Sequence, residues 1–377
     1  MMNIAFIVTG LGMGGAENQV VGLADRFASL GHRVLVISMT GNSFVLPRSP
    51  AVRIQSLDMP KTVKGFVSAY RCARHYLREF KADVVHSHMV HANVFARLLR
   101  LTTDMPRLIC TAHSINEGGN ARMLAYRLTD WLADMTTSVS DIGMNIYIQQ
   151  RAARPHKIST VHNGIDCQLF RFSASARERI RQSLDVPEGM QLILAVGRMT
   201  EAKDYGNLLQ AMSNVLAQRR NCMLCIAGDG ELRSVHESQA RSLGIASRVR
   251  FLGLRRDIPD LMSAADLFVL SSAWEGLPLV VGEALACERL VVSTDAGGIR
   301  EWLGDAGHIV PVMDANALAN AMLHALSLDR HDREIQGRIG RERVLAHYSM
   351  EAVVERWLQM YQGRFSGSEE SAHFASD

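Results

Sequence analysis

Short apolar runs alternate with segments of helical periodicity along almost all of this 377-residue chain, and this alternation restricts the possible folds most strongly. In the first part, the strand-length apolar runs are residues 4–9, 33–38, 83–86, 107–111 and 135–139. Residues 16–30 and 63–80 carry apolar side chains at helical spacing. Strands that alternate with helices form right-handed βαβ units, so we expect an α/β fold built on a parallel sheet.

The same pattern starts again in the second part of the chain. The strand-length runs there are residues 191–196, 223–227, 249–252, 267–270, 290–293 and 308–310. Two successive series predict two Rossmann-like doubly wound domains, residues 1–165 and 166–348, with the boundary in the turn-forming segment 161–166. A helix at 350–362, within residues 349–365, is expected to return toward the first domain. The polar tail, 366–377, is expected to be disordered.

Composition and charge narrow the class of protein. No apolar run approaches the roughly 20 residues of a membrane-spanning helix. The N-terminal run leads directly into glycines and lacks the preceding basic residues of a signal peptide, so we expect a cytoplasmic protein. Residues 1–165 hold 18 Lys and Arg against 10 Asp and Glu, whereas the rest hold 23 against 28. This asymmetry suggests different partners for the two halves.

A C-x-x-C pair, Cys222 and Cys225, lies inside an apolar strand. An odd spacing sends the two side chains to opposite faces of a strand, which favours buried free thiols over a metal or redox site.

A glycine-rich turn, from Gly10 to Gly15, follows the first predicted strand and formally matches G-x-G-x-x-G. A dinucleotide site would also need an acidic residue at the end of the second strand, but residues 37–41 contain none, which argues against NAD. Two interpretations remain. The turn either serves packing alone, or its backbone N–H groups and the following helix N-terminus approach a diphosphate.

Two cations, Arg198 and Lys203, follow the first strand of the second domain, in Gly197-Arg-Met-Thr-Glu-Ala-Lys203. Ligands of parallel sheets bind beyond the carboxyl ends of the strands. We expect both cations on an exposed loop, where a guanidinium fork and a compact ammonium suit the oxygens of a diphosphate. This role is favoured over that of two solvated surface cations.

The segment Trp274-Glu-Gly-Leu-Pro-Leu-Val-Val-Gly-Glu283 follows a predicted strand and enters a helix. Glu275 is expected on the loop and Glu283 within the helix, with Pro278 in the first helical turn. The backbone amides of Gly276 and Leu277 would face an anion at the positive end of the helix. A carboxylate beside a phosphate site is better suited to accept hydrogen bonds from sugar hydroxyls.

Together these motifs resemble glycosyltransferase family 4, a large family of retaining GT-B enzymes that includes bacterial O-antigen, capsule and exopolysaccharide transferases. The resemblance covers most of the chain. It rests on the E-x7-E pair Glu275 and Glu283, the Arg-x4-Lys pair Arg198 and Lys203, and the turn at Gly14 and Gly15. The loop 228–230 and residues 249–253 also fit regions that line the nucleotide in this family.

The resemblance implies two domains facing a central cleft and a role for each matched residue. Glu275 would contact the donor sugar and Glu283 the nucleotide ribose, while Arg198 and Lys203 would hold the diphosphate as a leaving group. His113 matches a histidine kept beside the donor sugar. The remaining residues expected at the nucleotide are Gly14, Gly15, Asp229, Gly230, Gly276 and Leu277. On the acceptor side we expect His88, His91 and Asn93.

Neither a metal nor another cofactor is expected. The chain has no D-x-D pair, which metal-dependent glycosyltransferases commonly use, so cations and helix N-termini would neutralise the leaving diphosphate. The family resemblance implies retention at the anomeric carbon. Since no carboxylate is an obvious nucleophile, front-face displacement assisted by the departing phosphate is favoured over double displacement.

The basic residues in and beside the predicted helix 63–80 have two interpretations. They either contact an anionic membrane or form a solvated face of the helix. They are Lys61, Lys64, Arg71, Arg74, Arg78 and Lys81, with Arg97, Arg100 and Arg107 nearby in sequence.

The predicted function is transfer of a hexosyl group from a UDP-sugar, or alternatively a GDP-sugar, to a saccharide or lipid-linked saccharide in cell-surface polysaccharide biosynthesis. Nucleic acid is not an expected partner. Three alternatives stay open: an NAD-dependent oxidoreductase, a sugar-nucleotide epimerase and a non-catalytic nucleotide-sugar-binding protein.

Overall fold

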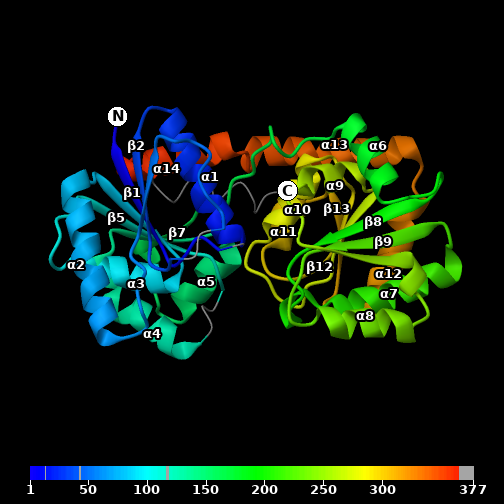
Figure 1. The fold of residues 1–377 in the computed structure, drawn as a ribbon, viewed down its shortest axis with the longest axis horizontal. Coiled ribbons are helices and arrows are strands. Elements are labelled where there is room, and N and C mark those ends of the chain that lie inside the picture. Colours follow the sequence, from blue (N-terminus) through cyan, green and yellow to red (C-terminus); the bar gives the residue numbers. More distant parts are fainter. Residues whose placement is uncertain (13, 42–43, 116–118, 365–377) are drawn as a thin grey trace. The chain divides into compact units, whose positions relative to one another are not determined.

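The computed structural model describes residues 1–12, 14–41, 44–115 and 119–364. The chain forms two compact units (Figure 1): one contains residues 1–164 together with the segment from Met350 onward, and the other contains Ile165–Ser349. The predicted tail, 366–377, lies outside the described residues. In the described part of the chain, no helix combines the length and the apolar character needed to cross a membrane.

The first unit is built on a parallel sheet in the order β3-β2-β1-β4-β5-β6-β7. The strands are β1 (Asn3–Val8), β2 (Arg33–Ser38), β3 (Val52–Ser56), β4 (Val84–His88), β5 (Arg107–Ala112), β6 (Met135–Ser138) and β7 (Ile158–Thr160). The helices are α1 (Gly15–Ser29), α2 (Val63–Phe80), α3 (Val90–Leu99), α4 (Asn120–Thr129), α5 (Asp141–Gln149) and α14 (Met350–Tyr361).

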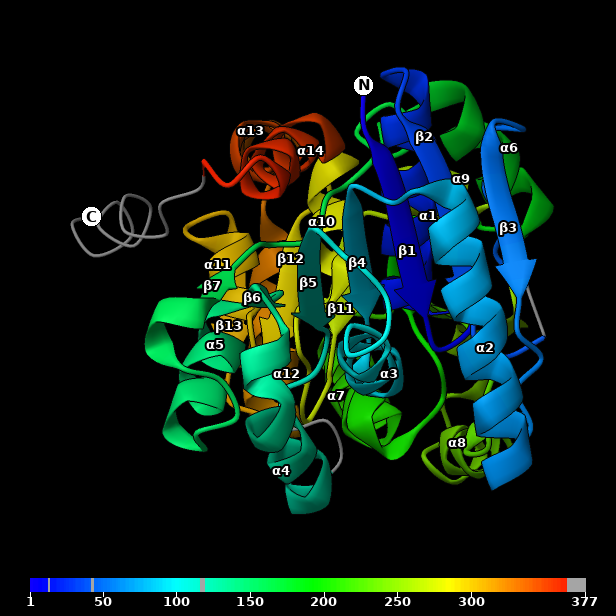
Figure 2. The ribbon, with the colours of Figure 1, turned by 90° about the vertical axis from the view of Figure 1, so that its left-hand side faces the viewer.

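Helices cover both faces of this first sheet. Successive side chains of a strand point to opposite faces, so neighbouring residues enter two different core clusters. Phe6 of β1 packs in the core cluster formed with α1 and α14, whereas Ile7 packs in the cluster formed with α2 and α3. Figure 2 shows α2, α3 and α4 on the near side of the sheet. The strands β1, β2 and β5 contain almost continuous apolar residues, as expected for strands buried on both faces.

The second unit contains a parallel sheet in the order β10-β9-β8-β11-β12-β13. The strands are β8 (Gln191–Val196), β9 (Cys222–Ala227), β10 (Val249–Gly253), β11 (Leu267–Leu270), β12 (Val291–Thr294) and β13 (Gly307–Val310). The helices are α6 (Ala174–Ser183), α7 (Tyr205–Gln218), α8 (Arg233–Ser242), α9 (Ile258–Ala264), α10 (Leu279–Ala286), α11 (Ile299–Leu303), α12 (Ala315–Ser327) and α13 (Arg330–His347).

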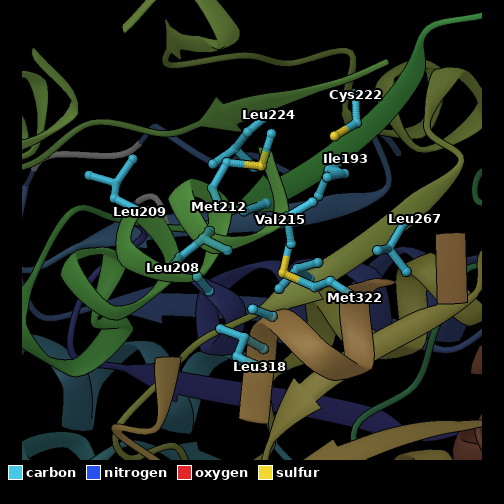
Figure 3. Close-up of a cluster of buried hydrophobic side chains, with 14 of the residues drawn as sticks. Ile193, Leu208, Leu209, Met212, Val215, Cys222, Leu224, Leu267, Leu318 and Met322 are labelled. Carbon is cyan, nitrogen blue, oxygen red and sulfur yellow. The ribbon is translucent and has the colours of Figure 1, made fainter. Parts of the chain in front are cut away.

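One side of this second sheet carries α7 and α12, and Figure 3 shows the buried cluster that their side chains form. Met212 of α7 and Met322 of α12 pack with Ile193 of β8 in one buried cluster. Cys222 belongs to the same cluster, while Cys225 does not, and both are buried free thiols. Burial of these apolar side chains stabilises the second sheet and thereby positions the loops that leave its carboxyl edge.

The strand order reverses direction once in each sheet. In the first sheet this switch lies between β1 and β4, and in the second between β8 and β11. Loops diverge at such a point and leave a crevice at the carboxyl edge where ligands of doubly wound sheets bind. The glycine-rich turn follows β1, the Arg198–Lys203 loop follows β8, and the Glu275 loop follows β11.

Candidate active site

Lys203 and Glu275 come from the two loops that flank the switch point of the second sheet, and they form an ion pair. Nζ of Lys203 lies 2.5 Å from Oε1 of Glu275. The two side chains are only 18% and 15% exposed. Partial burial strengthens such a pair relative to a surface ion pair because solvent screens it less. The proposed lysine of the diphosphate site is therefore paired, in this structure, with the proposed acid of the sugar site.

Arg198 differs from Lys203. It lies on the same loop, but its side chain is exposed and has no hydrogen-bond or ion-pair partner among the described residues. Lys203 ends a short 3-10 turn, Glu201–Lys203, and Asp204 then adopts a left-handed conformation and caps α7. We expected both cations on an exposed loop. This is wrong for Lys203, because the turn folds its side chain inward onto Glu275.

Glycines let the backbone approach closely around these cations. Gly228, with φ of +143°, lies so near Gly197 that a Cβ would meet the Gly197 carbonyl oxygen at 2.0 Å. A Cβ on Gly230 would meet the carbonyl oxygen of Met199 at 2.5 Å. The loop after β9 is thus pressed against the loop after β8, and larger residues would separate them. Asp229 lies between the two glycines, and its Oδ2 atom is 3.4 Å from Nη1 of Arg233.

The N-terminus of α10 presents unpaired backbone donors. The N–H groups of Gly276 and Leu277 have no hydrogen-bond partner within the described residues. Pro278 stands at the N-cap, one residue before the helix, so no side chain caps this end. Free N–H groups and the positive end of the helix dipole both favour an anion here.

Gly297 supports this loop from the end of β12. Its φ is +67°, and a Cβ there would lie 2.2 Å from the carbonyl oxygen of Glu275. The N–H of Gly298 also donates to the carbonyl of Gly276. These contacts fix the backbone of the Glu275 loop, and only glycine fits at position 297.

Glu283 lies within α10, as predicted, and is largely buried. Its carboxylate has no hydrogen-bond or ion-pair partner in the described part of the chain, and burial raises its pKa from 4.5 to about 7. Desolvation without a compensating charge disfavours the ionised form. A buried carboxyl group with no partner of its own is suited to accept hydrogen bonds from a bound ligand.

In the first unit, Gly14 and Gly15 begin α1, whose N-terminus has no side-chain cap. The carboxylate of Glu17 folds back over this turn, so that a Cβ on Gly14 would lie 2.4 Å from Oε2 of Glu17. Residue 13 of the turn lies outside the described residues. The sequence prediction did not include Glu17.

His113 follows β5 and contacts His88 at the end of β4. Nδ1 of His88 lies 2.9 Å from Nε2 of His113. Burial lowers the pKa of His113 to about 4 and holds that of His88 well below its usual value. Both rings are therefore neutral near pH 7, so one of the two nitrogens donates and the other accepts. The structure thus brings together two histidines that the sequence assigned to the donor and acceptor sides.

The other residues expected on the acceptor side do not join them. Asn93 is completely buried, accepts a hydrogen bond from Ser87 and donates to the Thr111 carbonyl and to Tyr126. The acceptor-side role of Asn93 is wrong, because its amide group is fully used inside the core. His91 is exposed on α3.

Comparison with known proteins gives the family. Residues 176–343 match the model described as glycosyl transferases group 1, and residues 13–169 match that described as glycosyltransferase family 4. The two models together span most of both units. The chain belongs to glycosyltransferase family 4. The family and enzyme class predicted from the sequence are thereby confirmed, and the oxidoreductase, epimerase and non-catalytic alternatives are set aside.

Relatives of this family 4 glycosyltransferase include bacterial glycosyltransferases. It is 24% identical over 281 residues, 71% of this chain and 72% of the relative, to the UDP-Gal:alpha-D-GlcNAc-diphosphoundecaprenol alpha-1,3-galactosyltransferase of Escherichia coli. It is 32% identical over 182 residues, 48% of this chain and 52% of the relative, to the lipopolysaccharide core biosynthesis glycosyltransferase LpsE of Rhizobium meliloti.

The crystal structure of Anabaena HepE in complex with UDP has the same fold. Its TM-score is 0.82 at 22% identity, covering 96% of this chain and 100% of that one. The GT-B fold predicted from the sequence is confirmed, with sheets of seven and six parallel strands. The roles of the individual site residues stay predictions.

Proposed function

We propose that this family 4 glycosyltransferase transfers a hexosyl group from a nucleotide diphosphate-sugar to a saccharide or lipid-linked saccharide acceptor. The observation that carries the proposal is the group of hydrogen-bond donors at the carboxyl edge of the second sheet. There, the unpaired Arg198, the ammonium of Lys203 and the free N–H groups at the start of α10 supply donors for a diphosphate. Glu275 lies beside them and supplies acceptors for sugar hydroxyls.

The favoured donor is a UDP-sugar, with a GDP-sugar as the alternative. HepE was crystallised with UDP, and the Escherichia coli relative is named for transfer from UDP-Gal. That relative is also named for a diphosphoundecaprenol-linked acceptor, and the Rhizobium relative for lipopolysaccharide core biosynthesis. These names support an acceptor of the same chemical class and a role in cell-surface polysaccharide biosynthesis.

The proposed reaction retains the configuration of the anomeric carbon and uses no metal. The bond from the anomeric carbon to the diphosphate oxygen breaks, and the acceptor oxygen bonds to the same face. The acceptor proton passes to the departing phosphate oxygen. Arg198 and Lys203 stabilise the charge that develops on the diphosphate, which is the task a divalent ion performs in other transferases. Glu275 orients the sugar, and Glu283 accepts a hydrogen bond from the ribose.

Peripheral contact with the inner face of an anionic plasma membrane belongs to the same proposal, with the enzyme in the cytoplasm. The apolar residues at the start of α2 support it. Val63, Phe66 and Val67 are 83%, 36% and 42% exposed, so this end of the helix presents apolar side chains to solvent. Exposed apolar side chains among Lys61, Lys64 and Arg71 form an amphipathic surface of the kind that binds anionic lipid.

A nucleotide-sugar panel tests the proposed function. We expect a UDP-sugar to raise the unfolding temperature of the purified enzyme more than UMP does, and a GDP-sugar to do less. The panel contains UDP-glucose, UDP-galactose, UDP-N-acetylglucosamine, GDP-mannose and NADH. Protection by none of the nucleotide sugars contradicts the donor assignment.

A further inference from the structure

One oxygen of the Glu275 carboxylate receives both of its contacts. Oε1 accepts from Nζ of Lys203 at 2.5 Å and from the hydroxyl of Ser272 at 2.7 Å. The other oxygen, Oε2, has no hydrogen-bond partner among the residues that the structure describes. The carboxylate is therefore anchored through one oxygen while the second stays available to a ligand.

The two donors to Oε1 differ in how firmly they are held. Ser272 is completely buried directly after β11, and its carbonyl accepts a hydrogen bond from Oγ1 of Thr294 at 2.6 Å. The backbone that carries its hydroxyl is thus tied to the neighbouring strand, β12. The ammonium of Lys203 ends a flexible four-carbon chain with three donors. Its contact with Glu275 is the one that a bound ligand can change.

A diphosphate competes with Glu275 for the Lys203 ammonium, because it carries more negative charge than one carboxylate. The Ser272 hydroxyl is enclosed by protein and has a single proton to donate, so its bond to Glu275 has no such competitor. We propose that Ser272 is a positioning residue, which keeps Glu275 oriented toward the donor sugar once the diphosphate has drawn Lys203 away. This inference rests on the proposed function of Glu275 and Lys203.

The neighbouring serine shows that the arrangement is specific to Ser272. The hydroxyl of Ser271 donates to the backbone carbonyl of Lys203 at 2.8 Å and so holds the lysine's turn rather than the acid. The two consecutive hydroxyls thus support the two members of the ion pair separately. A hydroxyl three residues before Glu275 was visible in the sequence, but its partner was not.

Ser272→Ala tests the inference, with Ser293→Ala as a matched control. Ser293 is also completely buried near the end of a strand, β12, but its hydroxyl donates to the carbonyl of Thr294 and has no other hydrogen-bond partner among the described residues. With the best nucleotide sugar of the panel at saturation, we expect Ser272→Ala to lower the rate of UDP release on the order of 10-fold. The dissociation constant of free UDP should stay within about 2-fold, and Ser293→Ala should match the wild type in both.

A double-mutant cycle with Glu275→Gln separates positioning from a general structural role. If Ser272 acts through Glu275, Ser272→Ala should cause no further loss of rate in a Glu275→Gln background. Losses that multiply, or a loss of UDP affinity in Ser272→Ala, would overturn the inference. Should Ser272→Ala fold poorly, Ser272→Cys keeps a weak donor of similar size and should give an intermediate rate.

A different outcome would overturn the proposed function. A Glu275→Gln variant with the wild-type rate removes the role of Glu275, whatever Ser272 does. A strong effect of Glu275→Gln together with a wild-type rate in Ser272→Ala would instead overturn the positioning role alone.

Discussion

Glu275 holds Lys203 by a contact of 2.5 Å across 72 positions of sequence, while Arg198, five positions before that lysine, has no partner within the part of the chain that the structure describes. The Arg-x4-Lys pair thus consists of one cation that is free to meet an anion and one that must exchange partners. Loss of the two cations should therefore have unequal consequences for the folded state.

We predict that Arg198→Ala and Lys203→Ala each weaken transition-state stabilisation by about 1.5–3 kcal/mol, or on the order of 10- to 150-fold in kcat/KM. Only Lys203→Ala should also lower the free energy of unfolding, by about 1–3 kcal/mol, because it leaves the partly buried Glu275 without its counter-charge. Steady-state kinetics and urea denaturation measure the two effects. Wild-type kinetics in either variant would place the diphosphate elsewhere.

Substitution of the two glutamates should affect different steps of the reaction. Glu275→Gln should lower kcat strongly with little change in the affinity for free UDP, because the sugar contact gains strength as positive charge develops on the sugar. Glu283→Gln should weaken binding of UDP itself, since a ribose contact is the same in ground and transition states. Calorimetry with UDP and kinetics with the donor separate them, and the opposite pattern would invert the assignment.

The pKa of Glu283 predicts a pH-dependent cost to stability. The folded protein keeps a proton on this carboxyl up to about pH 7, whereas the unfolded chain releases it near 4.5, so stability falls as pH rises through this interval. We expect Glu283→Gln to be more stable than the wild type by about 1–3 kcal/mol at pH 8. The difference should disappear below pH 4.5. Urea unfolding at several pH values measures it, and a constant gap would show that the carboxyl is not buried and neutral.

Turnover should survive a chelator. Arg198, Lys203 and the start of α10 supply the positive potential that the leaving diphosphate needs, so we expect full activity in EDTA. Loss of UDP release in EDTA, restored by magnesium or manganese, would contradict this prediction.

Substitution of four basic residues around α2 should weaken binding to anionic vesicles and spare turnover of a soluble acceptor analogue, because each contributes about 1 kcal/mol near the surface. Vesicle sedimentation measures the binding. The residues changed to Gln are Lys61, Lys64, Arg71 and Arg74.

The matched control removes the same charge from exposed arginines of the second unit. The residues changed to Gln are Arg171, Arg220, Arg241 and Arg338. Equal losses in the two variants would indicate attraction by net charge alone, and a wild type that does not bind vesicles would exclude the membrane contact.

Strands buried on both faces were predictable because their side chains are apolar throughout. All six strands of the second sheet were found within about two residues, as in Leu267–Leu270. Two edge strands of the first sheet were missed. Val52–Ser56 alternates with polar residues because one face is open to solvent, and Ile158–Thr160 is too short to give a periodic pattern.

The motifs located the site's loops but not the contacts between its side chains. Periodicity could not show that Lys203 turns inward, because its partner lies on another strand's loop. It also could not show that Asn93 satisfies a core polar network, since a polar residue in a helix is exposed more often than buried. At the start of α2, the helical spacing of apolar residues could not show that Val63 is 83% exposed, because spacing alone does not reveal which turns of a helix are covered.

The last helix has a consequence for how the enzyme is made. Tyr361 of α14 hydrogen-bonds to His86 at 2.6 Å, and Trp357 packs in the same core as Phe6, so the first unit is complete only when the final helix joins it. About 185 residues, Ile165–Ser349, are translated in between. At roughly 5–20 residues per second, the nascent first unit waits on the order of 10–40 seconds with an uncovered apolar face. Over that interval we expect the exposed apolar face to be open to chaperones, and a chain that ends before Met350 lacks the helix that covers it.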